Sequence, residues 1–94
     1  MVVTFDKISD ESKIWIFQSN RLIPDLDIES LKKQIDIFLS SWTSHGKQLM
    51  VASTIKYNLF IIIALDQSRS TASGCSIDKL VSFIKNIEND YQIS

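Results

Sequence analysis

Apolar residues gather in five blocks along the chain, and the first block has the character of a buried β-strand. Residues 13–18 are rich in the β-branched and aromatic side chains that favour strands. Trp15 and Phe17 lie on one face of this predicted strand, and Ile14 and Ile16 lie on the other. Because the strand is apolar on both faces, we expect both faces to be covered.

Two longer blocks repeat at the spacing of an amphipathic helix, one over residues 28–43 and one over residues 77–91. Asp27 is the predicted N-cap of the first helix, and Ser76 is the predicted N-cap of the second. Gly46 follows the first helix, at the place where a left-handed residue commonly ends a helix. The apolar positions that define the two helices are Ile28, Leu31, Ile35, Phe38, Leu39 and Trp42, then Ile77, Leu80, Val81, Ile84, Ile87 and Tyr91.

The two remaining blocks predict a β-hairpin. Residues 48–56 alternate between apolar and polar side chains, which is the pattern of a half-exposed strand. Residues 59–65 are wholly apolar and predict a more deeply buried strand. Tyr57 and Asn58 between them suit a tight turn, because asparagine tolerates positive φ. The expected order of elements is therefore β-α-β-β-α.

This order predicts an α+β fold, in which two helices pack on one face of a three-stranded, mainly antiparallel sheet. A right-handed β-α-β crossover leaves a gap between its strands, and we expect the apolar strand 59–65 to fill it antiparallel. These are the first five elements of a ferredoxin-like plait, which normally ends with a further strand beside the first. The strand 13–18 is then an open edge. We therefore expect either a homodimer through that edge or a missing C-terminal segment of a longer protein.

The composition narrows the class of protein further. The 94 residues are 45% hydrophobic and 22% charged, which indicates one folded domain spanning residues 1–94. Ten basic and eleven acidic residues give a net charge of −1 without a basic stripe, so we expect no nucleic-acid partner. The longest apolar run, 59–65, is about a third of what a membrane-spanning helix needs, so we expect no membrane span. A single cysteine and the lack of a signal-peptide pattern favour a cytoplasmic protein.

Three segments carry a distinctive combination of residues. They read Ile-Trp-Ile-Phe-Gln-Ser-Asn-Arg at 14–21, Ser-Trp-Thr-Ser-His-Gly at 41–46 and Ser-Gly-Cys-Ser-Ile-Asp at 73–78. Together they resemble a family of proteins of unknown function from Bacteroidetes, often labelled ABC transporter ATPases, and the likeness extends over essentially the whole chain. Members of that family are generally longer, so the resemblance implies that this chain is the N-terminal part of a longer protein.

ATP hydrolysis is not expected of this chain despite that label. A P-loop needs Gly-x-x-x-x-Gly-Lys-Ser/Thr, so that backbone N–H groups cradle the phosphates while the lysine reaches the terminal ones. The two glycines of the chain, Gly46 and Gly74, lie far apart, and the one Gly-Lys pair is followed by Gln48. Whether the chain is an enzyme of another kind stays open.

Cys75 and His45 are the candidate catalytic residues. Cys75 stands at or just before the start of the second predicted helix, where the helix dipole and free N–H groups make a thiol more reactive. His45 is the only histidine, and a Cys-His pair is the minimum for thiol nucleophilic catalysis. The competing interpretation is structural, with a small residue under the helix start and a polar residue at a helix end.

Two polar segments are candidate ligand sites. The loop at 68–76 offers hydroxyl groups and free N–H groups before a helix, which suits an anion or another small ligand. The segment after the first strand offers Arg21 as a clamp for an acid group. The commoner interpretation of the 68–76 loop is an ordinary polar loop followed by a capped helix, and the segment after the first strand is also explained by simple turn chemistry. The candidate binding residues are Asn20, Arg21, Ser73, Gly74 and Ser76.

No cofactor and no metal site are expected, because one histidine and one cysteine cannot supply a structural zinc site. Three functions follow from these observations. The leading hypothesis is a non-enzymatic binding or assembly domain, acting as a homodimer or as part of a larger protein. The alternatives are a small thiol-dependent enzyme or redox sensor that uses Cys75, and an anion-binding or small-ligand site at residues 68–76.

Overall fold

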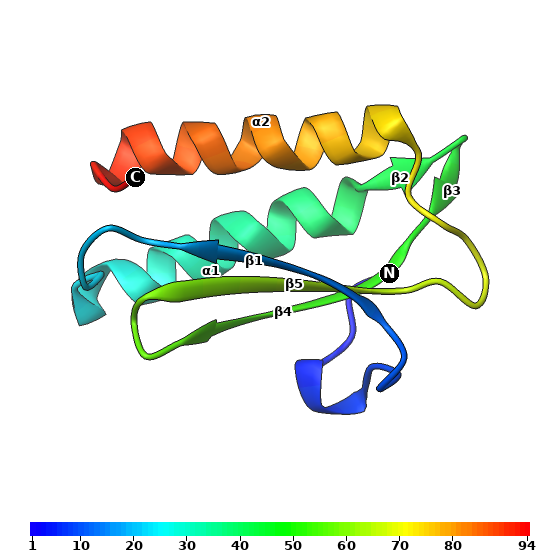
Figure 1. The fold of residues 1–94 in the computed structure, drawn as a ribbon, viewed down its shortest axis with the longest axis horizontal. Coiled ribbons are helices and arrows are strands. Elements are labelled where there is room, and N and C mark those ends of the chain that lie inside the picture. Colours follow the sequence, from blue (N-terminus) through cyan, green and yellow to red (C-terminus); the bar gives the residue numbers. More distant parts are fainter.

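Two helices lie on one face of a three-stranded sheet, and the strands of that sheet are ordered β1-β5-β4 (Figure 1). The computed structural model describes residues 1–94. After a short 3-10 turn, η1 (Phe5–Lys7), the elements run β1 (Lys13–Gln18), α1 (Asp25–Ser41), β2 (Thr43–Ser44), β3 (Lys47–Gln48), β4 (Met50–Lys56), β5 (Phe60–Asp66) and α2 (Gly74–Tyr91). Neither helix combines the length and the apolar character needed to cross a membrane.

The sheet has the arrangement that the apolar pattern predicts. β5 is the central strand, and it pairs antiparallel with β1 on one side and with β4 on the other. The α+β class, the antiparallel pairing and the central place of the apolar strand are therefore confirmed. The closer likeness to a ferredoxin-like plait stays a prediction.

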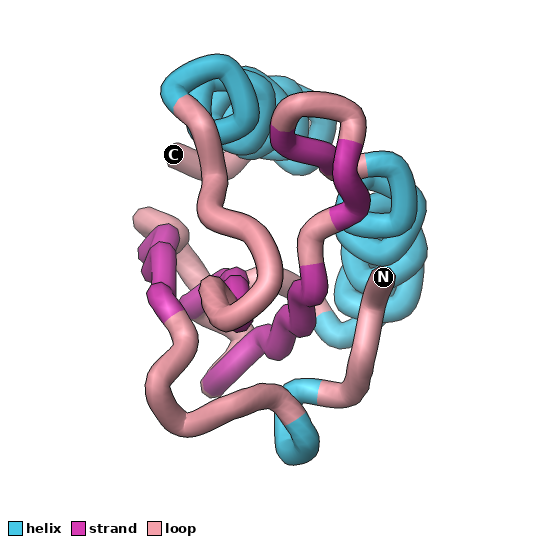
Figure 2. The backbone as a smooth tube through the Cα atoms, turned by 90° about the vertical axis from the view of Figure 1, so that its right-hand side faces the viewer, coloured by secondary structure: helices cyan, strands magenta, loops and turns pink.

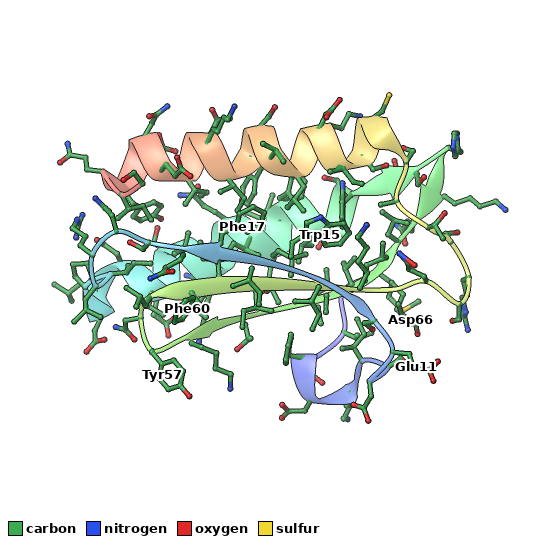
Figure 3. All side chains as sticks on the ribbon, viewed as in Figure 1. Glu11, Trp15, Phe17, Tyr57, Phe60 and Asp66 are labelled. Atoms are coloured by element: carbon green, nitrogen blue, oxygen red, sulfur yellow. The ribbon has the colours of Figure 1, made fainter.

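The pairing register assigns the side chains of β1 to two different environments. Trp15 lies opposite Ile63, and Ile16 lies opposite Ile62. Trp15 and Phe17 point toward the two helices, on what we call the helix face of the sheet (Figure 3). Ile16 and Ile62 lie on the opposite side, which we call the outer face. Figure 2 views the fold end-on, with both helices beyond the helix face and η1 beyond the outer face.

The core fills the space between the helix face and the two helices. α1 contributes residues four positions apart, and α2 contributes residues three or four positions apart, because these spacings keep side chains on one side of a helix. Fourteen buried residues form this cluster. They are Ile23, Leu31, Ile35, Leu39, Trp42, Leu49, Val51, Ile61, Ile63, Leu65, Leu80, Ile84, Ile87 and Ile93.

Aromatic rings join the two helices to β1 within this core. The Trp42 ring meets the Trp15 ring edge-on with centroids 5.8 Å apart, and Phe38 stacks on Phe83 at 4.4 Å. Both geometries are among those that aromatic pairs prefer. Trp42 is buried in the core, and Trp15 is partly buried and packs against it.

Both helices begin earlier than predicted. α1 starts at Asp25 with Pro24 as its N-cap, so the assignment of Asp27 as N-cap is wrong, and Asp27 lies in the first turn. Proline sets φ near its helical value, and the acidic residues of the first turn favour the positive end of the helix dipole. α2 starts at Gly74 with Ser73 as its N-cap, so the assignment of Ser76 as N-cap is also wrong. The Ser73 hydroxyl oxygen accepts the N–H of Ser76 at 3.1 Å.

Two hairpins connect the regular elements. The predicted turn at Tyr57 and Asn58 is confirmed, since both residues have positive φ, 57° and 53°. A smaller hairpin, β2–β3, was not predicted. Gly46 has positive φ as expected, but with His45 it forms the tip of this hairpin instead of ending α1. α1 ends at Ser41 because Trp42 already has an extended backbone.

The N-terminal residues cover one edge of the sheet and part of its outer face. The Val51 N–H donates to the Met1 carbonyl, and the Val3 N–H donates to the Val51 carbonyl, so the outer edge of β4 is paired there. η1 then packs near β4 on the outer face, where Ala52 and Ala64 are fully buried. The sequence pattern did not indicate this cover.

Candidate functional site

β1 is the open edge of the sheet. It pairs with β5 on one side only, whereas the outer edge of β4 is occupied in part by the N-terminal residues. A free edge presents unpaired N–H and C=O groups to any extended strand that approaches it. The edge at β1 is therefore a candidate interaction surface.

The flanking hydrogen bonds show which backbone groups of β1 face outward. The Ser19 N–H donates to the Leu59 carbonyl at 2.7 Å, on the β5 side, while the Asn20 N–H donates to the Ser94 carbonyl at 2.8 Å, on the other side. Backbone groups alternate in direction along an antiparallel strand. The N–H and C=O groups of the even-numbered residues Ile14, Ile16 and Gln18 therefore point away from β5.

Apolar side chains accompany these outward groups on the outer face. Ile14 is 51% exposed and Ile16 is 62% exposed. In the pairing register, Ile14 lies opposite Ala64, Ile16 opposite Ile62 and Gln18 opposite Phe60. Figure 3 places Phe60 and Tyr57 beyond the outer face, away from the helices. The expectation that both faces of β1 are covered is wrong, because both helices pack on the helix face and η1 lies nearer β4.

The end of the chain meets β1 at one point of this edge. The Asn20 N–H donates to the Ser94 carbonyl, and the Ser94 N–H donates to the Asn20 side-chain oxygen at 3.0 Å. Ile93 before it is buried in the core. Ser94 thus pairs with the outward side of Asn20, two residues after the end of β1. The outward backbone groups of Ile14, Ile16 and Gln18 do not bond to Ser94.

His45 and Cys75 lie at one end of the molecule, around a shallow hollow of about 590 Å³. The tip of the β2–β3 hairpin brings His45 to the first turn of α2, where Cys75 is exposed. The structure therefore places the two candidate catalytic residues around one hollow. Thiol catalysis requires a nucleophile hydrogen-bonded to its base, which is a stricter condition than sharing a hollow.

Ser73 and Ser76 line the same hollow, and their hydroxyl groups bond within the protein. The Ser76 hydroxyl donates to the Thr43 carbonyl at 2.7 Å and lies 2.8 Å from the Ser73 hydroxyl. The Trp42 indole N–H donates to the Ser76 carbonyl at 2.8 Å in the buried interior. These serines fasten the start of α2 to the segment after α1, which favours the structural interpretation of the 68–76 loop.

A hydrogen bond between Ser68 and Asp66 forms a turn at the start of the loop before α2. The Ser68 backbone N–H donates to the Asp66 carboxylate at 2.9 Å. This bond holds the pKa of Asp66 below its usual range, with smaller contributions from the Ser68 side chain and from Arg69. The pairing is a turn built on the end of β5.

Asn20 and Arg21 lie far from Ser73, Gly74 and Ser76. The Arg21 guanidinium donates to the carbonyls of Tyr91 at 2.8 Å and Gln92 at 3.3 Å, at the C-terminal end of α2. Ser73 and Gly74 are at the other end of the same helix. The candidate binding residues therefore form two separate groups, and Arg21 is a partner for the exposed carbonyls of a helix end.

Comparison with known proteins returns no match among family models, curated proteins or solved structures. The resemblance to the Bacteroidetes family stays a prediction. The case for a function therefore depends on the geometry of the chain itself.

One feature of the β1 edge has a signal in the sequence. Ile14 and Ile16 alternate with two aromatic residues in a strand that occupies an edge of the predicted sheet. The sequence does not indicate whether the even-numbered or the odd-numbered residues of β1 have outward backbone groups, because this depends on how β1 is aligned with β5. The placement of His45 and Cys75 around one hollow likewise depends on the β2–β3 hairpin, whose strands of two residues are too short to show a periodic pattern.

Proposed function

We propose that this chain is a non-enzymatic assembly domain that forms a homodimer through the open edge at β1. The observation that carries the proposal is the combination of outward backbone groups at Ile14, Ile16 and Gln18 with exposed isoleucine side chains beside them. An edge strand of this kind binds another strand through main-chain hydrogen bonds and side-chain contacts together. The alternative is that a segment of a longer protein, of which this chain is a part, fills the same edge.

The energetic case combines two favourable terms. Each new backbone hydrogen bond at an edge contributes about 1 kcal/mol net. Covering the exposed part of Ile14 and Ile16 adds about 1 kcal/mol for each side chain, at about 25 cal/mol per Å². Natural edge strands usually avoid this outcome with a central charge, a proline or a bulge. β1 has a single charged residue, Lys13, at its first position, and it has no proline.

The test compares the mass of the wild type with that of an Ile16→Pro variant by size-exclusion chromatography with light scattering. Proline removes the outward N–H of Ile16 and leaves the bonds toward β5 intact, and proline is tolerated at such edge positions. We expect the wild type to have the mass of two chains at high concentration and the variant to have the mass of one.

Ile37→Ser is the matched control, because Ile37 is an equally apolar residue that is 71% exposed on α1, away from the edge. This control is expected to dimerise like the wild type, and thermal unfolding should verify that every variant is folded. A wild type with the mass of one chain at millimolar concentration would contradict the homodimer and favour the longer-protein alternative.

A further inference from the structure

Self-pairing of β1 is restricted by symmetry. Homodimers are most often built on a two-fold axis. When two identical edge strands pair antiparallel in one continuous sheet, this axis is perpendicular to the sheet. This axis keeps each face of the sheet on the same side. Residues that lie opposite each other must therefore point to the same face, so their residue numbers must both be even or both be odd.

The outward backbone groups favour one of the registers that symmetry allows. If Ile16 lies opposite Ile16 of the second copy, then Ile14 lies opposite Gln18, and each outward N–H and C=O group of β1 meets a partner. Trp15 then lies opposite Phe17, in a pair without backbone hydrogen bonds, where side chains approach closely.

The neighbouring registers each lose bonds to groups that are already paired. A register centred on Trp15 would set Gln18 opposite Ser12, but the Ser12 N–H already donates to the Ser9 carbonyl at 3.1 Å. A register centred on Phe17 would set Ile14 opposite Asn20, but the Asn20 N–H already donates to the Ser94 carbonyl. The existing hydrogen bonds thus close both ends of the edge and leave the Ile16-centred register open.

Charge agrees with the antiparallel arrangement. Asp10 and Glu11 precede β1, and Arg21 follows it. In an antiparallel pair, the acidic approach to one strand lies toward Arg21 of the other copy. The arrangement therefore brings two acidic residues of one copy toward Arg21 of the other at both ends of the junction, while the Arg21 guanidinium keeps its bonds to the Tyr91 and Gln92 carbonyls and Lys13 adds a positive charge beside the acidic residues. Favourable charge placement of this kind contributes to fixing the register.

We infer that two copies of this chain join β1 to β1 about a two-fold axis at Ile16. This inference rests on the proposed assembly function and specifies its partner and its geometry. The product is a continuous six-stranded sheet, ordered β4-β5-β1-β1-β5-β4, with all helices on one face. The Ile16 side chains of the two copies lie side by side at the centre of the outer face.

The test is a register scan by disulfide formation, in a Cys75→Ser background so that no native thiol interferes. Single cysteines are introduced at positions 14, 16 and 18, and at the exposed helix position 37 as a control for random collision. Directly opposed residues in a hydrogen-bonded pair have Cα atoms about 5.5 Å apart, within the range that a disulfide spans. We expect Ile16→Cys to form covalent dimers at least about tenfold faster than Ile37→Cys, because pairing raises the effective thiol concentration.

Ile14→Cys and Gln18→Cys should each form covalent dimers slowly alone and rapidly when mixed with each other. Faster self-linking of Ile14→Cys or Gln18→Cys than of Ile16→Cys would overturn the register while the assembly function stands. Equal, slow linking of all four variants, together with the mass of a single chain in the reduced wild type, would overturn the register and the assembly function together. A reduced wild type with the mass of two chains, with no preferential linking at any β1 position, would overturn β1 as the junction.

Discussion

At the scale of single residues, two buried serines illustrate the cost of burying a hydroxyl group. Ser44 and Ser76 are both almost completely buried. The Ser76 hydroxyl donates to the Thr43 carbonyl and contacts the Ser73 hydroxyl, whereas the Ser44 hydroxyl has no hydrogen-bond partner. A buried hydroxyl without a partner costs the free energy of its lost hydration.

We expect Ser44→Ala to raise the free energy of unfolding by about 1 kcal/mol, because it removes an unsatisfied polar group from the interior. Ser76→Ala should lower it by about 1–2 kcal/mol, because the Thr43 carbonyl loses its donor. Chemical denaturation of the two variants and the wild type gives both values. Destabilisation of similar size in the two variants would contradict the view that the Ser76 hydroxyl is hydrogen-bonded and the Ser44 hydroxyl is not.

At the scale of elements, Arg21 joins the end of β1 to the end of α2. The last carbonyls of a helix have no partner within the helix, and a cation beside them also favours the negative end of the helix dipole. The Arg21 guanidinium supplies donors to Tyr91 and Gln92. These bonds of Arg21 therefore stabilise the C-terminal end of α2 in this structure.

Arg21→Ala should increase amide hydrogen exchange in the last turn of α2, because the Tyr91 and Gln92 carbonyls lose their donor. The effect should be confined to residues 88–93, since the change removes no buried side chain. Lys85→Ala is the matched control, because it removes a positive charge from an exposed position of the same helix. If Lys85→Ala increased exchange above the wild type as much as Arg21→Ala, the loss of positive charge would explain the effect and the hydrogen bonds of Arg21 would not.

The long elements could be predicted and the short ones could not. The helices around Leu31 and Leu80 and the central strand around Ile63 bury whole faces, so each leaves a clear period in the sequence. The β2–β3 hairpin has strands of two residues, which leave no period. The sequence does not place the start of α2 correctly, because Gly74 has a low helix propensity. Ser73 and Ser76 nevertheless have the three-residue spacing that joins an N-cap side chain to the backbone N–H it accepts.

At the scale of the whole molecule, the order of the strands followed from topology, but the coverage of the sheet did not. A right-handed crossover and a hairpin are enough to set β5 between β1 and β4. Which part of the outer face is covered depends on the path of residues 1–12, whose pairing with Val51 has no periodic signal. The N-terminal residues occupy the β4 edge and leave β1 open, and this asymmetry determines where another strand can add.

The most direct test of the β1 junction is amide hydrogen exchange of β1 measured at low and at high protein concentration. The N–H groups of Trp15 and Phe17 point toward β5 and should be protected at both concentrations. The N–H groups of Ile14, Ile16 and Gln18 point outward, so they should exchange fast when the chain is dilute and become protected as two copies pair. Fast exchange of these three amides at every concentration would contradict pairing of β1 with a second copy.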